Sequence, residues 1–288
     1  MMPRKPGKYW NESWNPVTGC TPCSPACENC WAEATAERLP QTHGKRAGKI
    51  LIGFAYHDTM LPIPFSEIVL HPDRLDQPLH WKKPRVVAVS LMGDLFHEDV
   101  PFRFHCDTFE QMILSDKHTY LVLTKRPDMM ATFCRGMQKY ITSWPAPNVW
   151  LGVSVWDQES ADRNIPILLD TPAAHHWISV EPMLGEVDLG LDACSCGPGA
   201  SCDPFRQDPD TCVHNPHLNQ VIAGCESGPN RRPALHAWLW SLKAQCLDAG
   251  VPYFLKQASA CKDGTGRVVK EPPLDGKQHL DLAWEAER

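Results

Sequence analysis

The sequence lacks any long apolar run. None of its uninterrupted apolar stretches approaches the roughly 20 residues that a membrane-spanning helix needs. Residues 1–9 are basic but are not followed by the apolar segment of a secretion signal. We therefore expect a cytosolic protein with no membrane partner.

The sequence also lacks an excess of positive charge. Lys and Arg number 28 against 34 Asp and Glu, which gives a net charge of −6. Such a chain is not expected to grip duplex DNA by charge alone, although a local basic pocket would still admit a nucleic-acid substrate. The thirteen cysteines of a cytosolic chain should stay reduced, so metal ligation is favoured over disulfides.

Four of these cysteines lie within eleven residues near the N-terminus: Cys20, Cys23, Cys27 and Cys30. Counted from Cys23 the spacing is C-x3-C-x2-C, and counted from Cys20 it is C-x6-C-x2-C. Either set places three thiolates on one short loop, which leaves one corner of a four-iron cluster open to an outside molecule. Open-cornered clusters do chemistry, so an enzyme is the leading hypothesis. A structural zinc site and a cluster closed by all four thiolates are the alternatives.

Apolar runs followed by turn residues recur along the chain and predict buried parallel strands. The predicted strands are 10–17, 86–90, 120–124, 149–155, 176–180, 220–224 and 251–255. Helix-like stretches are 30–39, 103–115, 129–141, 158–169 and 235–249. This alternation predicts an α/β fold, a partial or complete TIM-like βα barrel of about six to seven strand–helix units.

We assign residues 1–260 to this barrel and residues 261–288 to a C-terminal tail. Residues 192–219 interrupt the alternation and are dense in Cys, Gly, Pro and Asp, which predicts a loop insertion. The insertion offers ligands for a second metal site: Cys194, Cys196, Cys202 and Cys212. Zinc is the simplest occupant, an auxiliary iron–sulfur cluster is a second choice, and no metal is a third.

Polar residues follow the ends of the predicted strands. In βα barrels the catalytic groups come from the carboxyl ends of the strands and the loops after them. The residues at these positions include Asp94, Lys125, Ser154, Glu181, Glu226 and Lys256. The cysteine loop follows the first predicted strand, so we expect it at the same rim.

With its cysteine loop in that place, the chain resembles the radical S-adenosylmethionine (SAM) superfamily. More closely, it resembles a phage-associated family known for a three-cysteine motif. The matching segments are 14–20, 27–33, 93–97, 124–127, 151–155, 179–182, 224–229 and 254–257. The closer family's spacing selects Cys20, Cys27 and Cys30 as metal ligands, whereas the wider superfamily spacing selects Cys23 in place of Cys20. The residues that flank Cys20 favour the first set.

The resemblance implies an enzyme that uses a [4Fe-4S] cluster to cleave SAM and generate a 5′-deoxyadenosyl radical. It implies that Gly93 and Asp94 bind the SAM ammonium group and that Ser154 binds its ribose or carboxylate. Trp31 is a candidate for stacking on a base.

Glu181, Lys125 and Glu226 are the candidate catalytic residues. The implied partners are a reducing protein such as a flavodoxin and a substrate that is DNA or a nucleotide, in the host cytoplasm if the chain is phage-encoded. The implied reaction is an isomerase or other nucleobase-tailoring step in phage DNA hypermodification, with a modified thymine as the first choice of substrate. The alternative is a non-catalytic, zinc-stabilised binding protein on the same scaffold.

Overall fold

The computed structural model describes residues 3–38, 49–52, 55–58, 63–139, 141, 143–191, 218–228, 230–274 and 277–286. The four cysteines of the predicted insertion lie outside the described residues. The main element is an eight-stranded sheet with the order β1-β6-β7-β8-β9-β10-β11-β12. Its parallel strands are β1 (Glu12–Trp14), β6 (Val86–Val89), β7 (Thr119–Thr124), β8 (Val149–Val155), β9 (His175–Val180), β10 (Gln220–Gly224) and β11 (Tyr253–Ser259). The last strand, β12 (Val268–Lys270), runs antiparallel to β11.

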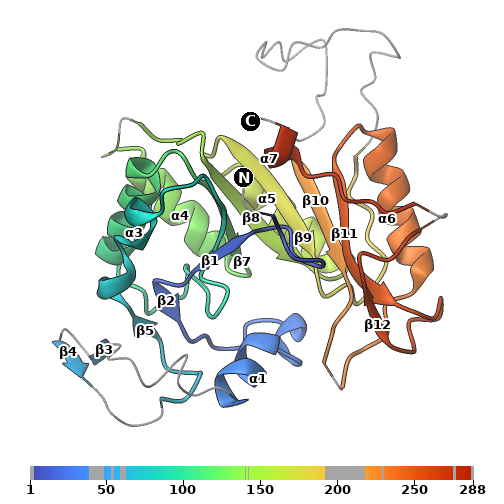
Figure 1. The fold of residues 1–288 in the computed structure, drawn as a ribbon, viewed down its shortest axis with the longest axis horizontal. Helices are drawn as coiled ribbons and strands as arrows, with labels where there is room; N and C mark the ends of the chain where they lie inside the picture. The colour runs from blue at the N-terminus through green and yellow to red at the C-terminus, as the bar shows by residue number, and fades with distance from the viewer. Residues whose placement is uncertain are drawn as a thin grey trace, which may run out of the picture.

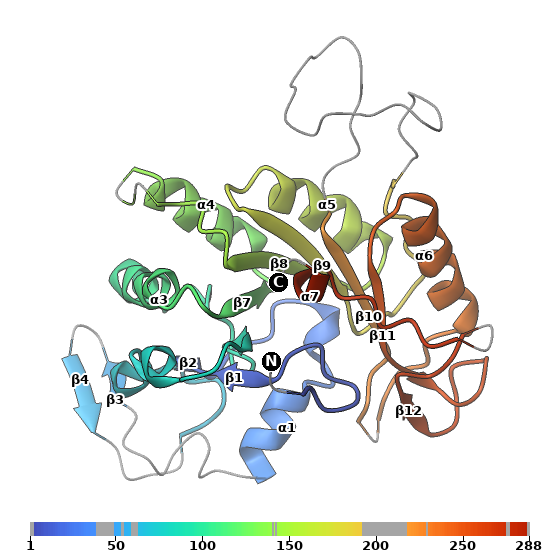
Figure 2. The ribbon, with the colours of Figure 1, turned by 45° about the horizontal axis from the view of Figure 1, so that its top comes forward.

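This sheet curls into an open arc, as Figures 1 and 2 show, so the molecule is a partial barrel. A helix follows each of β6, β7, β8 and β10, and these helices cover the outer side of the arc. They are α3 (Phe102–Leu114), α4 (Pro127–Met137), α5 (Gln158–Leu169) and α6 (His236–Asp248). The central strands are buried on both faces, β8 along all seven of its residues, which explains why they read as continuous apolar runs. The predicted α/β class is confirmed.

The inner side of the arc is filled by aromatic residues from both ends of the chain. Trp150 and Trp177 project inward from β8 and β9, in one cluster with Tyr9 near the N-terminus and Trp284 near the C-terminus. The rings of Trp150 and Trp284 lie 5.3 Å apart in an edge-to-face contact. Residues beyond 260, predicted from sequence as a tail, thus contribute β12, the helix α7 (Ala283–Ala286) and part of the interior.

The predicted strand at 10–17 is two short strands that join different sheets. β1 belongs to the large sheet, whereas β2 (Val17–Thr18) belongs to a small antiparallel sheet of order β2-β5-β3-β4. Pro16 separates them because it has no backbone N–H and restricts the residue before it. The other strands of the small sheet are β3 (Lys49–Ile52), β4 (Ala55–Asp58) and β5 (Val69–Leu70), and single 3-10 turns follow at Pro72–Arg74 and Gln77–His80.

The arc stays open between its edge strands β1 and β12, and α1 (Trp31–Arg38) lies at this opening (Figure 2). The N-terminal segment spans the opening, because Arg4 forms an ion pair with Glu271 just after β12. The Gly7 backbone N–H also donates to Glu271 Oε1, at 3.0 Å. No helix in the described part of the chain is long and apolar enough to cross a membrane.

Candidate functional site

The cysteine loop, residues 19–30, connects β2 to α1 and contains the 3-10 turn Pro25–Cys27. It contacts the segments that follow β6, β7 and β10. Gly19 forms a parallel bridge with Gly93, Cys23 Sγ lies 3.9 Å from the Lys125 carbonyl oxygen, and Asn29 donates to Glu226. The loop therefore lies at the carboxyl ends of the parallel strands.

The loop begins where two backbones touch. The Gly19 N–H donates to the Met92 carbonyl at 2.9 Å. Gly19 has a φ of +88°, and a Cβ atom there would lie 2.0 Å from the Glu67 carbonyl oxygen. A Cβ atom on Gly93 would lie 2.7 Å from the Gly19 carbonyl oxygen. Gly93, predicted to allow close approach of a cofactor, thus allows close approach of the cysteine loop itself.

Arg126 holds the middle of the loop. Its side chain is buried, and Nη2 donates to the carbonyl and hydroxyl oxygens of Thr21 at 3.1 and 2.9 Å. Its Nε donates to Glu98 Oε2 at 2.8 Å, and Nη1 lies 3.6 Å from Cys20 Sγ. Arg126 directly follows β7, where the sequence predicts residues that bind SAM or the substrate, and in the structure its side chain binds the cysteine loop.

Asp94 joins the ends of β6 and β7. Its carboxylate accepts the Thr124 hydroxyl at 2.7 Å and the backbone N–H groups of Phe96 and Lys125 at 3.0 and 3.1 Å. The residue is buried, and Arg126 Nη1 lies 3.9 Å from Oδ2. An ammonium group bound to Asp94 would be a fourth hydrogen-bond donor to this carboxylate, which already accepts from three neutral groups.

The four thiols of the loop are free but differ in environment. Cys23 is exposed and Cys20 is half-buried. Burial, with the nearby Asp94 carboxylate, raises the pKa of Cys20 to about 12. Hydrogen bonds from the Cys23 thiol and the Ser24 hydroxyl lower the pKa of Cys27 well below its usual range. The Cys27 thiol therefore ionises more readily than the Cys20 thiol, and the thiolate is the form that binds a metal or acts as a nucleophile.

The four reduced cysteines of this one short loop are the type of ligand that an iron–sulfur centre requires. Within the described residues, no three His, Cys, Asp or Glu side chains converge closely enough to hold an ion. Binding a cluster would therefore require the thiols to turn toward a common point.

Glu181 and Lys256 form an ion pair across β10. Lys256 Nζ lies 2.6 Å from Glu181 Oε1, and Gln257 Nε2 donates to the same oxygen at 3.3 Å. Gly224 on β10 makes room for this carboxylate, because a Cβ atom there would lie 3.2 Å from Glu181 Cδ. Both charged side chains stay 16% exposed, so they remain accessible at the rim. Ser154, at the end of β8, is buried.

Glu226 links the loop after β10 to the cysteine loop. Its carboxylate accepts from the Arg232 backbone and side chain and from Asn29 Nδ2 at 3.0 Å. Arg232 Nη1 also donates to Glu28 Oε2 at 2.9 Å, and Asn29 Nδ2 to the Asn230 carbonyl at 3.1 Å. We call these five residues the clasp. Burial would raise the pKa of Glu226, but the hydrogen bonds from Arg232 outweigh it and the pKa is lowered.

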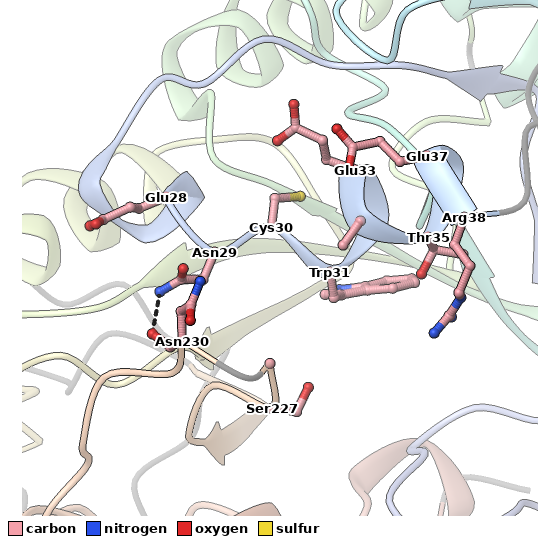
Figure 3. Close-up of a pocket in the computed structure, with 12 residues that line it drawn as sticks. Glu28, Asn29, Cys30, Trp31, Glu33, Thr35, Glu37, Arg38, Ser227 and Asn230 are labelled. Atoms are coloured by element: carbon pink, nitrogen blue, oxygen red, sulfur yellow. Dashed lines mark hydrogen bonds between the residues drawn. The ribbon is translucent and has the colours of Figure 1, made fainter. Parts of the chain in front are cut away.

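A pocket of about 540 Å³ lies against α1 and the clasp (Figure 3). Trp31 lines it with a side chain that is 50% exposed, so the indole is available for stacking rather than committed to the core. Figure 3 shows the Cys30 sulfur pointing away from the Trp31 ring. Arg38, Ser227 and Asn230 line the same pocket.

The structure brings some predicted site residues together around the loop. Gly93, Lys125 and Glu226 contact it directly, and Asp94 contacts the Arg126 that holds it. Glu181 directly follows β9 and forms its ion pair with Lys256 of β11.

The chain belongs to the DUF5131 family, described as a protein of unknown function, whose model matches residues 7–283. The comparison with curated proteins and with solved structures finds no match.

Proposed function

We propose that this chain is a radical SAM enzyme built on a TIM-like βα barrel. The observation that carries the proposal is the position of four free thiols on a loop held at the carboxyl ends of β6, β7 and β10. Charged side chains at the same ends, Asp94, Lys125 and Glu181, supply the polar groups that a cofactor and a substrate need.

Cys27 and Cys30 would hold a [4Fe-4S] cluster with Cys20 or Cys23 as the third ligand. When bound, the cluster would supply the electron that cleaves SAM. Asp94 would accept the SAM ammonium group next to Gly93. Ser154 and Trp31 would contact the rest of the cofactor, with Trp31 available because its indole is half exposed.

Glu181, Lys125 and Lys256 would act on the substrate. The Glu181–Lys256 pair is partly exposed and can exchange one internal contact for a polar substrate group or a proton. The Lys125 backbone carbonyl lies against the Cys23 thiol, so this residue is beside the cysteine loop, and its ammonium charge helps to lower the pKa of Cys27. The substrate class that we propose is a nucleobase, in DNA or as a nucleotide, and the electron donor a flavodoxin-like protein.

Anaerobic purification and reconstitution test the proposal. We expect a brown protein that releases 5′-deoxyadenosine from SAM under a strong reductant. Cys27→Ala and Cys30→Ala should abolish the visible iron–sulfur absorbance, whereas Cys106→Ala, a half-buried cysteine of α3, should keep it. A colourless protein that binds zinc through the same cysteines would contradict the proposal and support a non-catalytic binding protein.

A further inference from the structure

The carboxylate of Glu226 has little capacity left for a substrate. It accepts from the Arg232 backbone N–H at 2.6 Å, from Arg232 Nε at 3.1 Å and from Asn29 Nδ2 at 3.0 Å, and it forms an ion pair with Arg232 Nη2. Its side chain is only 4% exposed. Both guanidinium nitrogens bind Oε1, while the Arg232 backbone N–H and Asn29 Nδ2 bind Oε2, so charge-assisted hydrogen bonds occupy both oxygens of the carboxylate.

The clasp holds the two residues between Cys27 and Cys30. Asn29 is bound by Glu226 and Asn230, and Glu28 by Arg232. In a C-x2-C segment these two residues set the separation and direction of the flanking cysteines. The contacts therefore fix the positions of the Cys27 and Cys30 thiols, which belong to the ligand set whether the third ligand is Cys20 or Cys23.

The clasp also spans the open side of the arc. The cysteine loop follows the short strands β1 and β2, and β1 pairs with β6 alone in the large sheet. The opposite flank is formed by β10 to β12 and the loops that follow them. Side-chain contacts between Asn29 and Glu226, 197 residues apart in sequence, join the two flanks where strand pairing does not.

We infer that Glu226 and Arg232 are positioning residues that fix the Cys27–Cys30 segment at the rim, rather than groups that act on the substrate. The consequence for catalysis rests on the proposed function. The positioning role itself concerns the protein without any metal and is measured there.

Hydrogen exchange of the metal-free full chain tests the role. The Cys27 N–H donates to the Ser24 carbonyl at 3.0 Å and the Ala34 N–H to the Cys30 carbonyl at 3.1 Å, so these amides report on the loop. In Glu226→Gln the new amide group opposes the donors of Arg232 and Asn29. We expect exchange at these two amides to rise on the order of tenfold or more, and exchange in β8 to stay unchanged.

Two further variants make the result specific. Arg232→Lys cannot reach Glu226 and Glu28 together and should accelerate the same amides, with the double variant no worse than the stronger single one. Asp170→Asn breaks an exposed ion pair with Arg135 and should change neither amide. Equal acceleration in β8 would reduce Glu226 to a general stabiliser, and unchanged loop exchange would overturn the inference.

In reconstituted protein, Glu226→Gln and Arg232→Lys should lose iron to a chelator several-fold faster than the parent. If Glu226→Gln lost SAM cleavage while its hydrogen exchange in the loop and its iron retention stayed unchanged, Glu226 would act directly in the reaction. That result would contradict the inference. A chain that binds no iron at all would refute the proposed function, yet the exchange result on the metal-free protein would still decide the positioning role.

Discussion

At the scale of single residues, polar side chains of the rim are engaged by other parts of the rim. Asp94 ties β6 to β7, Arg126 ties α4 to the cysteine loop, and Glu226 ties that loop to β10. A buried charge must be paired, so residues predicted as cofactor ligands also serve the architecture of the site. Variants at these positions need controls that separate the two effects.

Asp94→Asn should weaken SAM binding about ten- to a hundred-fold, because one charge-assisted hydrogen bond is worth roughly 1.5–3 kcal/mol. Thr124→Val is the matched control, since it removes the hydroxyl that donates to Asp94 and leaves the charge. We expect SAM affinity, measured by calorimetry on reconstituted protein, to fall in the first variant and hold within a few-fold in the second. Equal losses would mean that Asp94 acts only as a structural link.

The third ligand of the proposed cluster can be identified by comparing Cys20→Ala with Cys23→Ala. The residues around Cys20 match the closer family, so we predict that its loss drains iron and stops SAM cleavage while the loss of Cys23 does little. Cys20 would have to turn its thiol away from Arg126 to bind iron, because the thiol is half-buried against that side chain. Iron per protein and 5′-deoxyadenosine formed under identical anaerobic conditions decide between them. The reverse pattern would select Cys23, and equal damage a closed four-thiolate cluster.

At the scale of elements, the loops after β2 and β6 pack against each other through glycine. The close approach of Gly19 and Gly93 leaves no space for a side chain, and the atoms in the way are backbone atoms that cannot rotate aside. The turn before β5 adds a further restraint, because the Cys20 N–H donates to the Phe65 carbonyl at 2.9 Å.

Gly93→Ala should therefore destabilise the protein by about 1–3 kcal/mol, since the new Cβ atom overlaps the Gly19 carbonyl. Gly136→Ala in α4 is the control, because its Cβ atom would meet only the Phe102 side chain at 3.5 Å. That change should be neutral or stabilise the helix by up to about 1 kcal/mol. Urea unfolding of both variants measures the difference, and a neutral Gly93→Ala would refute the packing role.

Helix α3 is anchored to the β6 loop by His105, whose Nε2 donates to the Leu95 carbonyl at 2.7 Å. Burial lowers the pKa of His105 to about 4 from its ordinary 6.5, so the unfolded chain takes up this proton first as pH falls. Stability from this group is intact above pH 6.5 and declines toward pH 4, by about 3 kcal/mol in total.

His105→Gln keeps an N–H donor but does not titrate. The free energy of unfolding of this variant, measured from pH 7 to pH 4, should decline less than that of the parent by about the same amount. Parallel pH profiles for parent and variant would show that His105 is not the titrating group.

At the scale of the whole molecule, both ends of the chain complete the partial barrel. Tyr9 and Trp284 fill the inner side of the arc, and the Arg4–Glu271 pair and the clasp cross its open side at two places. A sheet that does not close on itself leaves its inner face and edges unsatisfied, and here other segments cover them.

Trp284→Ala should lower the free energy of unfolding by about 3–5 kcal/mol, because it empties a fully buried site inside the arc. Trp240→Ala on α6, where the side chain is 38% exposed, should cost about 1 kcal/mol or less. Thermal and urea unfolding compare the two, and similar small effects would show that the C-terminal residues are not part of the barrel interior.

The sequence by itself determined the α/β class, the buried parallel strands and the helices between them, because apolar runs and helical periodicity are local patterns. The helix at 158–169 and the strand at 149–155 match their predicted bounds. It also located the rim, since polar residues after buried strands in parallel must share one edge.

Only the tertiary structure decided which polar groups of the rim meet. The Asn29–Glu226 and Thr21–Arg126 contacts join residues more than a hundred positions apart, and no spacing rule encodes them. The split of the first strand into two sheets and the burial of Trp284 depend in the same way on distant partners. Burial and pairing are properties of the packed whole, so local sequence names the groups while packing assigns their contacts.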